Sequence, residues 1–449
     1  MPTSTARPSS RLRVPLSAVA AAIALLTLAA ACSDAPDAGS FDVSPVGMFP
    51  AVTEAAAAYP LELVVTDQTG AARAGIRLDF AVQLGGGSVT PASAVSDAEG
   101  HVSLTWTLGL APVRNRLDAT VEGRDEFLFD IYATLATPYE PQPFGDVNAF
   151  LTDLGIAGST EDLAFSPDGE RLLMGVPGGL IELDPQGNAT QLALTGDALV
   201  NPLGIAFDRA GNLWVADSGA DALQRVSPTG EVTTVLTSDG TRPLVGPNYV
   251  AIGPDDKVYL SDPCLGALLR FDPQSNRVDA VLDFDLPVEG GPNGFAFDAS
   301  GKRLFLATEN TGLLCGHSFV GITDPIAGLF AIDVDDSSFT GRQTIAADFA
   351  LFGDGVAFDV EGNLYVIFDT QKNFMLEESA LWVLQAGNDR LVKVAAVHGR
   401  VLANIAFGSP QFGGGTAYLA LLAVPGFTPA TARGAELLDL GIAGLPLLP

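Results

Sequence analysis

The chain has 449 residues, 47% of them hydrophobic, which is enough to bury two or three separate cores. Glycine (49 residues) and proline (30) are frequent, and this favours many short strands joined by turns over long helices. The formal net charge is -30, so the surface repels phosphate backbones and anionic lipids. The composition therefore argues against nucleic-acid binding and against direct binding to a membrane surface.

The N-terminus has the pattern of an export signal. Three arginines within residues 7–13 precede an apolar run over residues 14–31, which ends in small residues. The ending before Cys32 resembles the lipobox of bacterial lipoproteins, apart from Ala29 where leucine is usual. This resemblance implies a signal peptide over residues 1–31 and a lipid anchor on Cys32; a plain secretory signal is the alternative. We therefore expect an exported lipoprotein of the bacterial cell envelope, with a flexible tether over residues 32–47.

The other two cysteines, Cys264 and Cys315, are predicted to pair. In an exported protein two remaining cysteines more often form a disulfide than stay free, and two free thiols are the alternative. The sequence contains no CxxC, HExxH, GxSxG or P-loop pattern. It therefore gives no support to HExxH-type zinc hydrolysis, serine-esterase chemistry or nucleotide hydrolysis.

Residues 48–137 are predicted to form a β-sandwich. Short alternating segments at 61–67, 76–82, 101–108 and 116–121 are separated by turn residues. The order from the glycine turn at 85–88 to the segment around Trp106 resembles bacterial invasin-type Ig-like domains, which implies a spacer or adhesion module. We expect Trp106 to lie in the core. Residues 138–144, which contain three prolines, are predicted to be a semi-rigid linker.

One short unit recurs six times between residues 145 and 449. Each unit begins with an apolar strand around an alanine, turns sharply, and continues with further strands. The alanines that mark the units are Ala164, Ala206, Ala251, Ala296, Ala357 and Ala406. Six such units predict a six-bladed propeller, with residues 146–154 as the fourth strand of the last unit. The predicted fold is therefore all-β, a six-bladed β-propeller preceded by an Ig-like β-sandwich.

The positions three residues before these alanines are equivalent, and they are Glu161, Leu203, Asn248, Asn293, Asp354 and Ala403. The first strand of each propeller blade begins beside the axis, so these positions should converge at the mouth of the central channel. Four of the six carry carboxylate or amide oxygens, the ligands that Ca²⁺ prefers. The alternative is that Asn and Asp simply begin strands after turns, which explains Glu161 poorly.

The motifs "GPNGFAFDASGKRLFLAT" and "FGDGVAFDVEGNLYVIF", with the C-terminal "LLDLGIAGLPL", resemble the gluconolactonase, regucalcin and luciferin-regenerating-enzyme family. The resemblance covers about residues 160–445. It implies that Glu161, Asn293 and Asp354 bind the metal, that Asn248 contacts the substrate beside it, and that Asp354 is also the base that activates water. It further implies a divalent metal, Ca²⁺ first and Zn²⁺ second, and hydrolysis of lactones.

The chain departs from this family in several places. Family lactonases carry Arg-x-Asn-Asp where this chain reads Gly-Pro-Asn-Tyr at 246–249, so the arginine and the aspartate are missing. Arg242 lies nearby in the sequence and is the candidate to substitute for the arginine. Asp162 follows Glu161 where glycine is common. Two insertions, residues 308–327 and 369–379, are predicted to be loops that rim the metal mouth and influence substrate choice. His317 in the first insertion is expected to be a surface residue rather than a catalytic one.

The sequence favours a metal-dependent hydrolase of lactones or related esters in the cell envelope, a monomer acting on a small-molecule substrate. The alternative is a non-catalytic, lipid-anchored extracytoplasmic binding protein with a structural calcium site, which the missing arginine and aspartate favour. A lyase like virginiamycin B lyase ranks last, because it needs a histidine-centred site and no histidine occupies the converging positions.

Overall fold

The structure is a computed structural model that describes residues 40–446, apart from 319–320, 322–325, 336–337, 373–374, 389 and 425–427. The signal peptide predicted over residues 1–31 and the predicted anchor residue Cys32 lie outside the described residues. Phe41–Pro449 form one compact unit. In the part of the chain that the structure describes, no helix is long and apolar enough to cross a membrane.

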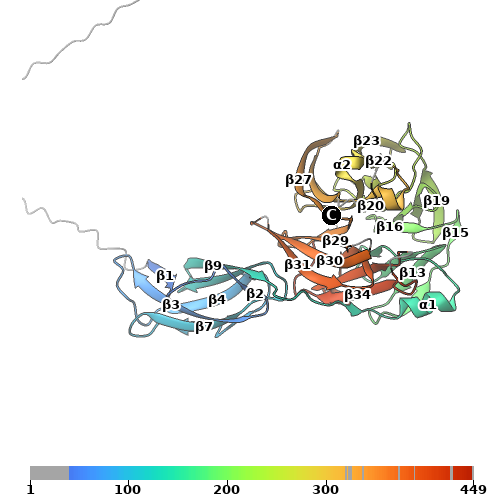
Figure 1. The fold of residues 1–449 in the computed structure, drawn as a ribbon. Helices are drawn as coiled ribbons and strands as arrows, with labels where there is room; N and C mark the ends of the chain where they lie inside the picture. Colours follow the sequence, from blue (N-terminus) through green and yellow to red (C-terminus); the bar gives the residue numbers. More distant parts are fainter. Residues whose placement is uncertain are drawn as a thin grey trace, which may run out of the picture. The chain divides into compact units, whose positions relative to one another are not determined.

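The regular structure is almost entirely β-strand, which confirms the all-β class that the glycine and proline content favours (Figure 1). The helices in the described ranges are short: α1 (Val147–Asp153), α2 (Leu286–Glu289), α3 (Thr311–Leu314) and a 3-10 turn (Pro410–Phe412).

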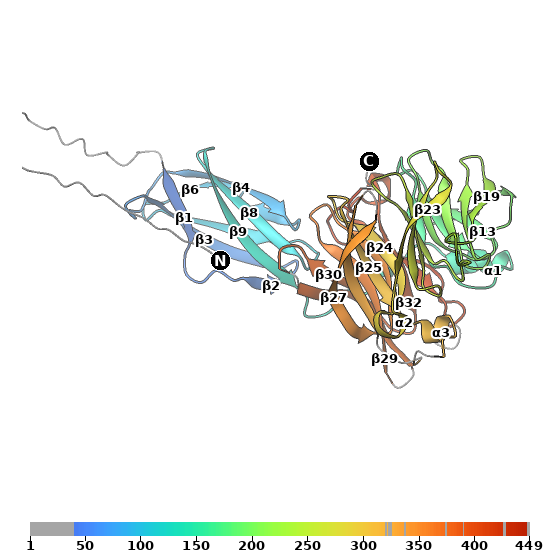
Figure 2. The ribbon, with the colours of Figure 1, turned by 90° about the horizontal axis from the view of Figure 1, so that it is seen from above.

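The N-terminal strands form two sheets that share one core (Figure 2). One sheet has the order β1-β3-β7-β5 and the other the order β2-β9-β8-β4-β6. Buried Leu61 and Leu63 alternate with exposed Glu62 along β3. Trp106 of β7, which pairs with Tyr59 of β3, is fully buried in the same core, as expected. The strands are β1 (Phe41–Pro45), β2 (Val52–Glu54), β3 (Ala58–Asp67), β4 (Arg77–Leu84), β5 (Ser88–Thr90), β6 (Ser93–Val95), β7 (His101–Thr107), β8 (Arg114–Val121) and β9 (Asp125–Thr134).

The predicted tether ends earlier than residue 47. Residues 41–45 pair with β3 as strand β1, in antiparallel register from Phe41 opposite Asp67 onward. Val43 of this strand is buried in the shared core. The prediction of a flexible segment there is wrong, because the alternating apolar side chains of this short strand add to one sheet face.

The strands of the rest of the chain fall into six groups, mostly antiparallel, and the fourth and fifth groups share one eight-stranded sheet. The first three groups contain β11 (Leu163–Phe165), β12 (Leu172–Val176), β13 (Gly179–Leu183) and β14 (Ala189–Gln191); β16 (Pro202–Phe207), β17 (Leu213–Asp217), β18 (Ala222–Val226) and β19 (Glu231–Leu236), with β15 (Thr195–Gly196) at the edge; and β20 (Tyr249–Ile252), β21 (Val258–Asp262), β22 (Ala267–Asp272) and β23 (Arg277–Asp283). The last three contain β24 (Gly291–Phe297), β25 (Arg303–Glu309), β26 (Ala327–Val334) and β27 (Phe339–Ala350); β28 (Phe352–Phe358), β29 (Leu364–Lys372), β30 (Met375–Gln385) and β31 (Arg390–Val397); and β32 (Val401–Phe407), β33 (Thr416–Leu422), β34 (Gly434–Asp439) and β10 (Gln142–Pro143).

The first strands of the six groups contact one another in a closed ring. β11 contacts both β16 and β32, and β20, β24 and β28 complete the circuit. An aromatic residue after the marker alanine packs edge-on against an aromatic residue in the second strand of the preceding group. These pairs are Phe165–Tyr418, Phe297–Tyr259, Phe358–Phe305 and Phe407–Tyr365, with ring centroids 4.9–5.4 Å apart. The aromatic residues of the recurring sequence unit therefore form the contacts between neighbouring groups.

The last group is completed by residues from the other end of the chain, although not by those predicted. Gln142 and Pro143 of β10 pair with Leu437 and Glu436 of β34, so the predicted linker supplies the fourth strand. The proline is tolerated because β10 is the edge of its sheet. The prediction of a strand over residues 146–154 is wrong, because Asp146 caps the helix α1 by accepting a hydrogen bond from the Ala149 N–H.

Glu361 connects a turn of the fifth group to the N-terminal sheets. Both of its carboxylate oxygens accept hydrogen bonds from the Gly85 N–H, at 2.9 Å each. Burial raises the pKa of Glu361 to about 7, and the charge of Asp359 acts in the same direction. The Gln385 amide adds two bonds to the same sheets, to the carbonyl oxygens of Pro112 and Ala133.

We predict that Glu361→Gln removes part of the pH dependence of folding. A glutamate in the unfolded chain has a pKa of about 4.3, so the raised value in the folded chain contributes stability that is complete below that pH and is lost as the pH rises through about 7. The thermal unfolding midpoint of the wild type, relative to the variant, should therefore fall between about pH 5 and about pH 8. A difference that is the same at both pH values would contradict this assignment.

Candidate functional site

The four oxygen-bearing positions expected from the repeat are all buried where the first strands begin. Their exposed fractions are 7% for Glu161, 8% for Asn248, 1% for Asn293 and 6% for Asp354. The Nδ2 of Asn248 donates to Oε1 of Glu161 at 2.8 Å. Burial, and next the charge of Glu161, raise the pKa of Asp354 well above its usual range. Side chains from the first, third and fifth groups therefore meet at one place.

Asn293 and Asp354 each lie in an irregularity of their ladder. The pairing of β24 with β25 skips from Pro292 to Phe295, so Asn293 has no partner on the second strand. β28 shows the same irregularity around Asp354. Such bulges turn side chains out of the regular alternation of a strand. The period-two pattern of the sequence therefore could not by itself determine where these two side chains point.

Glycine follows the site position in the second, fourth and fifth groups, as Gly204, Gly294 and Gly355. A Cβ on Gly294 would lie 2.5 Å from the carbonyl oxygen of Asp354, and a Cβ on Gly355 would lie 2.3 Å from Oδ1 of Asn404. At these glycines the first strand thus passes too close to the next for a side chain. The glycines allow the site residues of neighbouring groups to come together.

Asp162 occupies the equivalent position in the first group, where the family commonly has glycine. Its carboxylate accepts hydrogen bonds from the N–H groups of Leu163 and Ile205, at 2.7 Å each, and from Nδ2 of Asn404, at 2.5 Å. Asp162 therefore joins the first group to the second and the sixth. An aspartate at this position, where the family that the sequence resembles has glycine, therefore adds hydrogen bonds between neighbouring groups.

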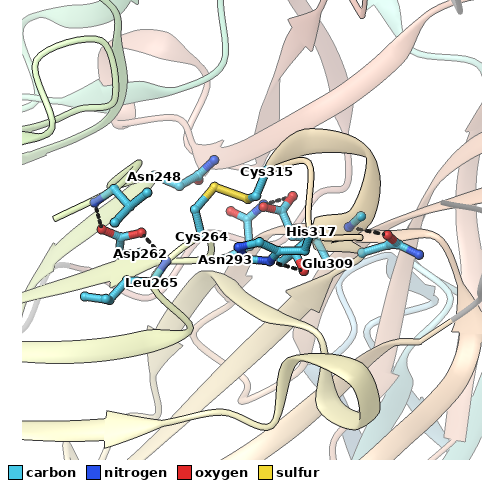
Figure 3. Close-up of a disulfide and its surroundings, with 12 residues drawn as sticks. Asn248, Asp262, Cys264, Leu265, Asn293, Glu309, Cys315 and His317 are labelled. Atoms are coloured by element: carbon cyan, nitrogen blue, oxygen red, sulfur yellow. Dashed lines mark hydrogen bonds between the residues drawn. A yellow bond between two sulfur atoms is a disulfide. The ribbon is translucent and has the colours of Figure 1, made fainter. Parts of the chain in front are cut away.

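Two more buried acids belong to this site, and the sequence did not identify them. Glu309 and Asp369 are 3% and 1% exposed, and Oε2 of Glu309 accepts a hydrogen bond from Nδ2 of Asn293 at 3.0 Å (Figure 3). Both lie near the end of the second strand of their group, where Asp217 and Asp262 also stand. The recurrence of an acid at this strand end was the available signal. Asp217 and Asp262, however, accept hydrogen bonds from backbone N–H groups of adjoining loops.

The site thus holds five buried carboxylates: Glu161, Asp162, Glu309, Asp354 and Asp369. Burial raises the pKa of all five, to about 7 for Glu161 and for Asp369. Acids placed in this way need protons or a bound cation to offset their mutual repulsion.

The amide of Asn293 offers a test of whether these residues suit a cation. Its Oδ1 is buried without a hydrogen-bond partner, and an unpaired buried amide oxygen is costly. Oxygen from carboxylates and amides is what Ca²⁺ binds. Over the described ranges there is no group of three or more His, Cys, Asp or Glu arranged for a metal. The expected set has only two carboxylates, those of Glu161 and Asp354, and relies on amides, so it fits an oxygen-preferring divalent cation.

The first insertion is fixed beside the site by a disulfide. Cys264 of the third group is bonded to Cys315, which follows directly on α3 (Figure 3). The side chain of Asn310 caps this helix by accepting a hydrogen bond from the Gly312 N–H. His317 lies in the same insertion, with Nδ1 3.1 Å from Oγ1 of Thr311. The backbone that follows Glu309 is therefore held at both ends of α3.

The second insertion is not a loop over its described residues. β29 and β30 continue to pair past Asp369 opposite Ser379, as far as Lys372 opposite Met375. The prediction of a loop there is wrong, because the apolar alternation stops at Phe368 while the backbone hydrogen bonding continues through polar residues.

Arg242 does not replace the missing arginine. Its Nε donates to Oδ2 of Asp239 at 2.7 Å, and its Nη2 donates to Oδ1 of Asp283 at 2.8 Å. The position of the missing aspartate is taken by Tyr249. Burial, and then the charge of Asp162, raise the pKa of the Tyr249 phenol well above its usual range, which keeps the phenol neutral.

A cavity of about 760 Å³ is lined by the first strands of all six groups. Asp162 and Tyr249 contribute to its wall, and so do the C-terminal residues 443–446. The Leu445 N–H donates to the carbonyl oxygen of Phe358, which fixes this segment to the fifth group. Of the five buried carboxylates, Asp162 alone lines this cavity, whose other walls are largely apolar.

No protein-family model and no curated protein sequence matches this chain. Among solved structures, a luciferin-regenerating enzyme is similar at 13% identity and a TM-score of 0.48, over 70% of this chain and 99% of its own. A gluconolactonase from Xanthomonas campestris is similar at 16% identity and 0.46, over 65% and 87%. An auxiliary nutrient binding protein from Bacteroides thetaiotaomicron is similar at 11% and 0.46, over 89% and 96%. At these values the likeness assigns neither an activity nor a site to this chain.

We predict that Gly294→Ala destabilises the protein by about 1–3 kcal/mol, because the new methyl group would collide with the backbone of Asp354. Gly179→Ala, in β13, is the matched control, since nothing lies within 4 Å of a Cβ there. The control should change the free energy of unfolding by less than about 0.5 kcal/mol in a denaturant titration. Equal effects of the two substitutions would show that the first strands do not pass as closely as described.

We predict that the double substitution Cys264→Ser/Cys315→Ser lowers the free energy of unfolding by about 2–4 kcal/mol, since the bond closes a loop across a separation of 51 residues. Reduction of the wild type should give a similar loss and should leave the double variant unchanged. Thermal unfolding with and without a reductant measures both. A wild type that is insensitive to reduction would contradict the assignment.

Proposed function

We propose that the six groups of strands are the blades of a six-bladed β-propeller, and that the N-terminal pair of sheets is an Ig-like sandwich. The closed ring of first strands supports the first assignment, and the two sheets around one core support the second. In this proposal the chain is a monomer exported to the bacterial cell envelope and anchored by lipid on Cys32.

The function that the geometry supports best is metal-dependent hydrolysis of lactones or related esters. One observation carries it, namely that buried carboxylates and amides from separate blades lie together where the first strands begin. Glu161, Asn293 and Asp354 would hold a divalent cation, with Ca²⁺ preferred and Zn²⁺ as the alternative. Asn248 lies beside this set through its bond to Glu161 and is the proposed substrate contact.

The proposed chemistry assigns one proton transfer to Asp354. A carboxylate oxygen of Asp354 accepts a proton from water as the water oxygen attacks the carbonyl carbon of the lactone. The ring C–O bond then breaks, and the proton passes to the departing alkoxide oxygen, which gives a hydroxy acid. The cation, when bound, would supply polarisation of the lactone carbonyl.

A second candidate is a binding protein without catalytic activity, in which the cation is structural. Two observations favour it: Tyr249 stands in place of the family aspartate, and Arg242 is already engaged by Asp239 and Asp283. The two candidates differ in turnover and not in cation binding. Ca²⁺ should raise the thermal unfolding midpoint in both cases, and only a hydrolase should consume a substrate.

We predict that the purified protein hydrolyses at least one member of a lactone and aryl-ester panel with Ca²⁺ and not after chelation. Asp354→Asn should lower kcat/KM by about 100- to 10,000-fold, because the amide cannot accept the proton. Asp153→Asn, at an exposed position, is the control and should keep wild-type activity. Calcium binding without turnover of any substrate would contradict the hydrolase proposal and favour the binding protein. The absence of any bound cation would contradict both proposals.

A further inference from the structure

Glu309 is placed between two of the proposed metal ligands and is not one of them. It is paired across β24 with Gly291, two residues before Asn293, and across β28 with Phe352, two residues before Asp354. Its side chain is 3% exposed. The hydrogen bond from Nδ2 of Asn293 to Oε2 of Glu309 measures 3.0 Å, so the carboxylate acts directly on the amide.

This contact fixes which way the Asn293 amide faces. An ionised carboxylate can only accept hydrogen bonds, whereas an amide presents an NH₂ group on one side and an oxygen on the other. The bond from Nδ2 to Oε2 places the NH₂ group toward Glu309, and with this carboxylate ionised the opposite orientation would set two oxygens against each other. The amide oxygen is left on the other side, where it is buried and unpartnered.

The backbone around Glu309 is held firmly enough to serve this purpose. The Asn310 N–H donates to the carbonyl oxygen of Leu351, and the preceding residue, Thr308, accepts a hydrogen bond from the Gly328 N–H through its hydroxyl. The disulfide at Cys315 ties the end of the following helix to the third group. The backbone of Glu309 is thus held in place on both sides, and a residue that orients a metal ligand must be fixed in this way.

We propose that Glu309 is a positioning residue that turns the Asn293 amide so that its oxygen faces the cation. This inference rests on the proposed cation site, and it assigns a role to a residue that makes no contact with the cation. An amide oxygen is a good ligand for Ca²⁺ and an amide NH₂ is not. Loss of the orienting carboxylate therefore weakens cation binding although every ligand is still present.

The test is the dissociation constant for Ca²⁺, measured by calorimetry on the whole exported chain. Glu309→Met should weaken binding by about 10- to 100-fold, the range typical of residues that orient metal ligands. Asp369→Asn is the matched control, because it removes one negative charge from the same cluster and no bond to Asn293. Its constant should stay within about threefold of the wild type, well short of the Glu309→Met loss.

A rescue variant separates orientation from charge. In Asn293→Asp/Glu309→Met the net charge equals that of the wild type, and either oxygen of the new carboxylate can bind the cation, so orientation no longer matters. Binding should return to within about tenfold of the wild type. If Glu309→Met does not fold, Glu309→Gln replaces it, since glutamine can also donate to the amide oxygen and should likewise weaken binding.

Wild-type Ca²⁺ affinity in the Glu309 variants would overturn the inference while leaving the cation site intact. An equal loss of affinity in Asp369→Asn would do the same, because it would make charge the cause. A rescue variant as weak as Glu309→Met would also overturn it. A wild type that binds no Ca²⁺ would instead overturn the proposed function, and the role of Glu309 with it.

Discussion

Close approach of the six first strands around a common centre is the constraint on which the rest of the structure depends. Each first strand lies against the next, and β32 returns to β11. At Gly294 and Gly355 the distance is so short that a Cβ would overlap the neighbouring strand. Asp162 stands at the position equivalent to these glycines, and its side chain accepts hydrogen bonds that join the first group to the second and the sixth. Closure and the site are thus consequences of the same packing.

That packing concentrates acids in a way that would be unfavourable without a compensating ligand. The carboxylates of Glu161 and Asp354 come from segments far apart in the chain, and burial removes the water that would screen them. Protonation is one solution, and a divalent cation is another. A cation could also satisfy the amide oxygen of Asn293, which is buried without a hydrogen-bond partner.

One side of the site is neutral and largely apolar. Tyr249 presents a neutral phenol in place of an acid, and the wall of the cavity beside it is largely apolar. The disulfide between Cys264 and Cys315 fixes one rim.

The sequence by itself determined the all-β class, the recurring unit and the positions of Glu161, Asn248, Asn293 and Asp354. It could do so because the marker alanines and their aromatic neighbours repeat at a fixed offset from these residues, and a repeat carries its register along the chain. The cysteine count also predicted the Cys264 and Cys315 pair, because these are the two cysteines that remain after Cys32.

Only the tertiary structure decided which further residues join Glu161, Asn293 and Asp354 in the site. Glu309 and Asp369 lie at strand ends that look like those of Asp217 and Asp262, and whether such an acid caps a loop or enters the site depends on the loop opposite it. The closing strand at Gln142 and Pro143 was hidden for the same reason, since its partner β34 lies almost the whole length of the domain away. Contacts between distant segments leave no periodic trace in the sequence, and those contacts complete both the ring and the site.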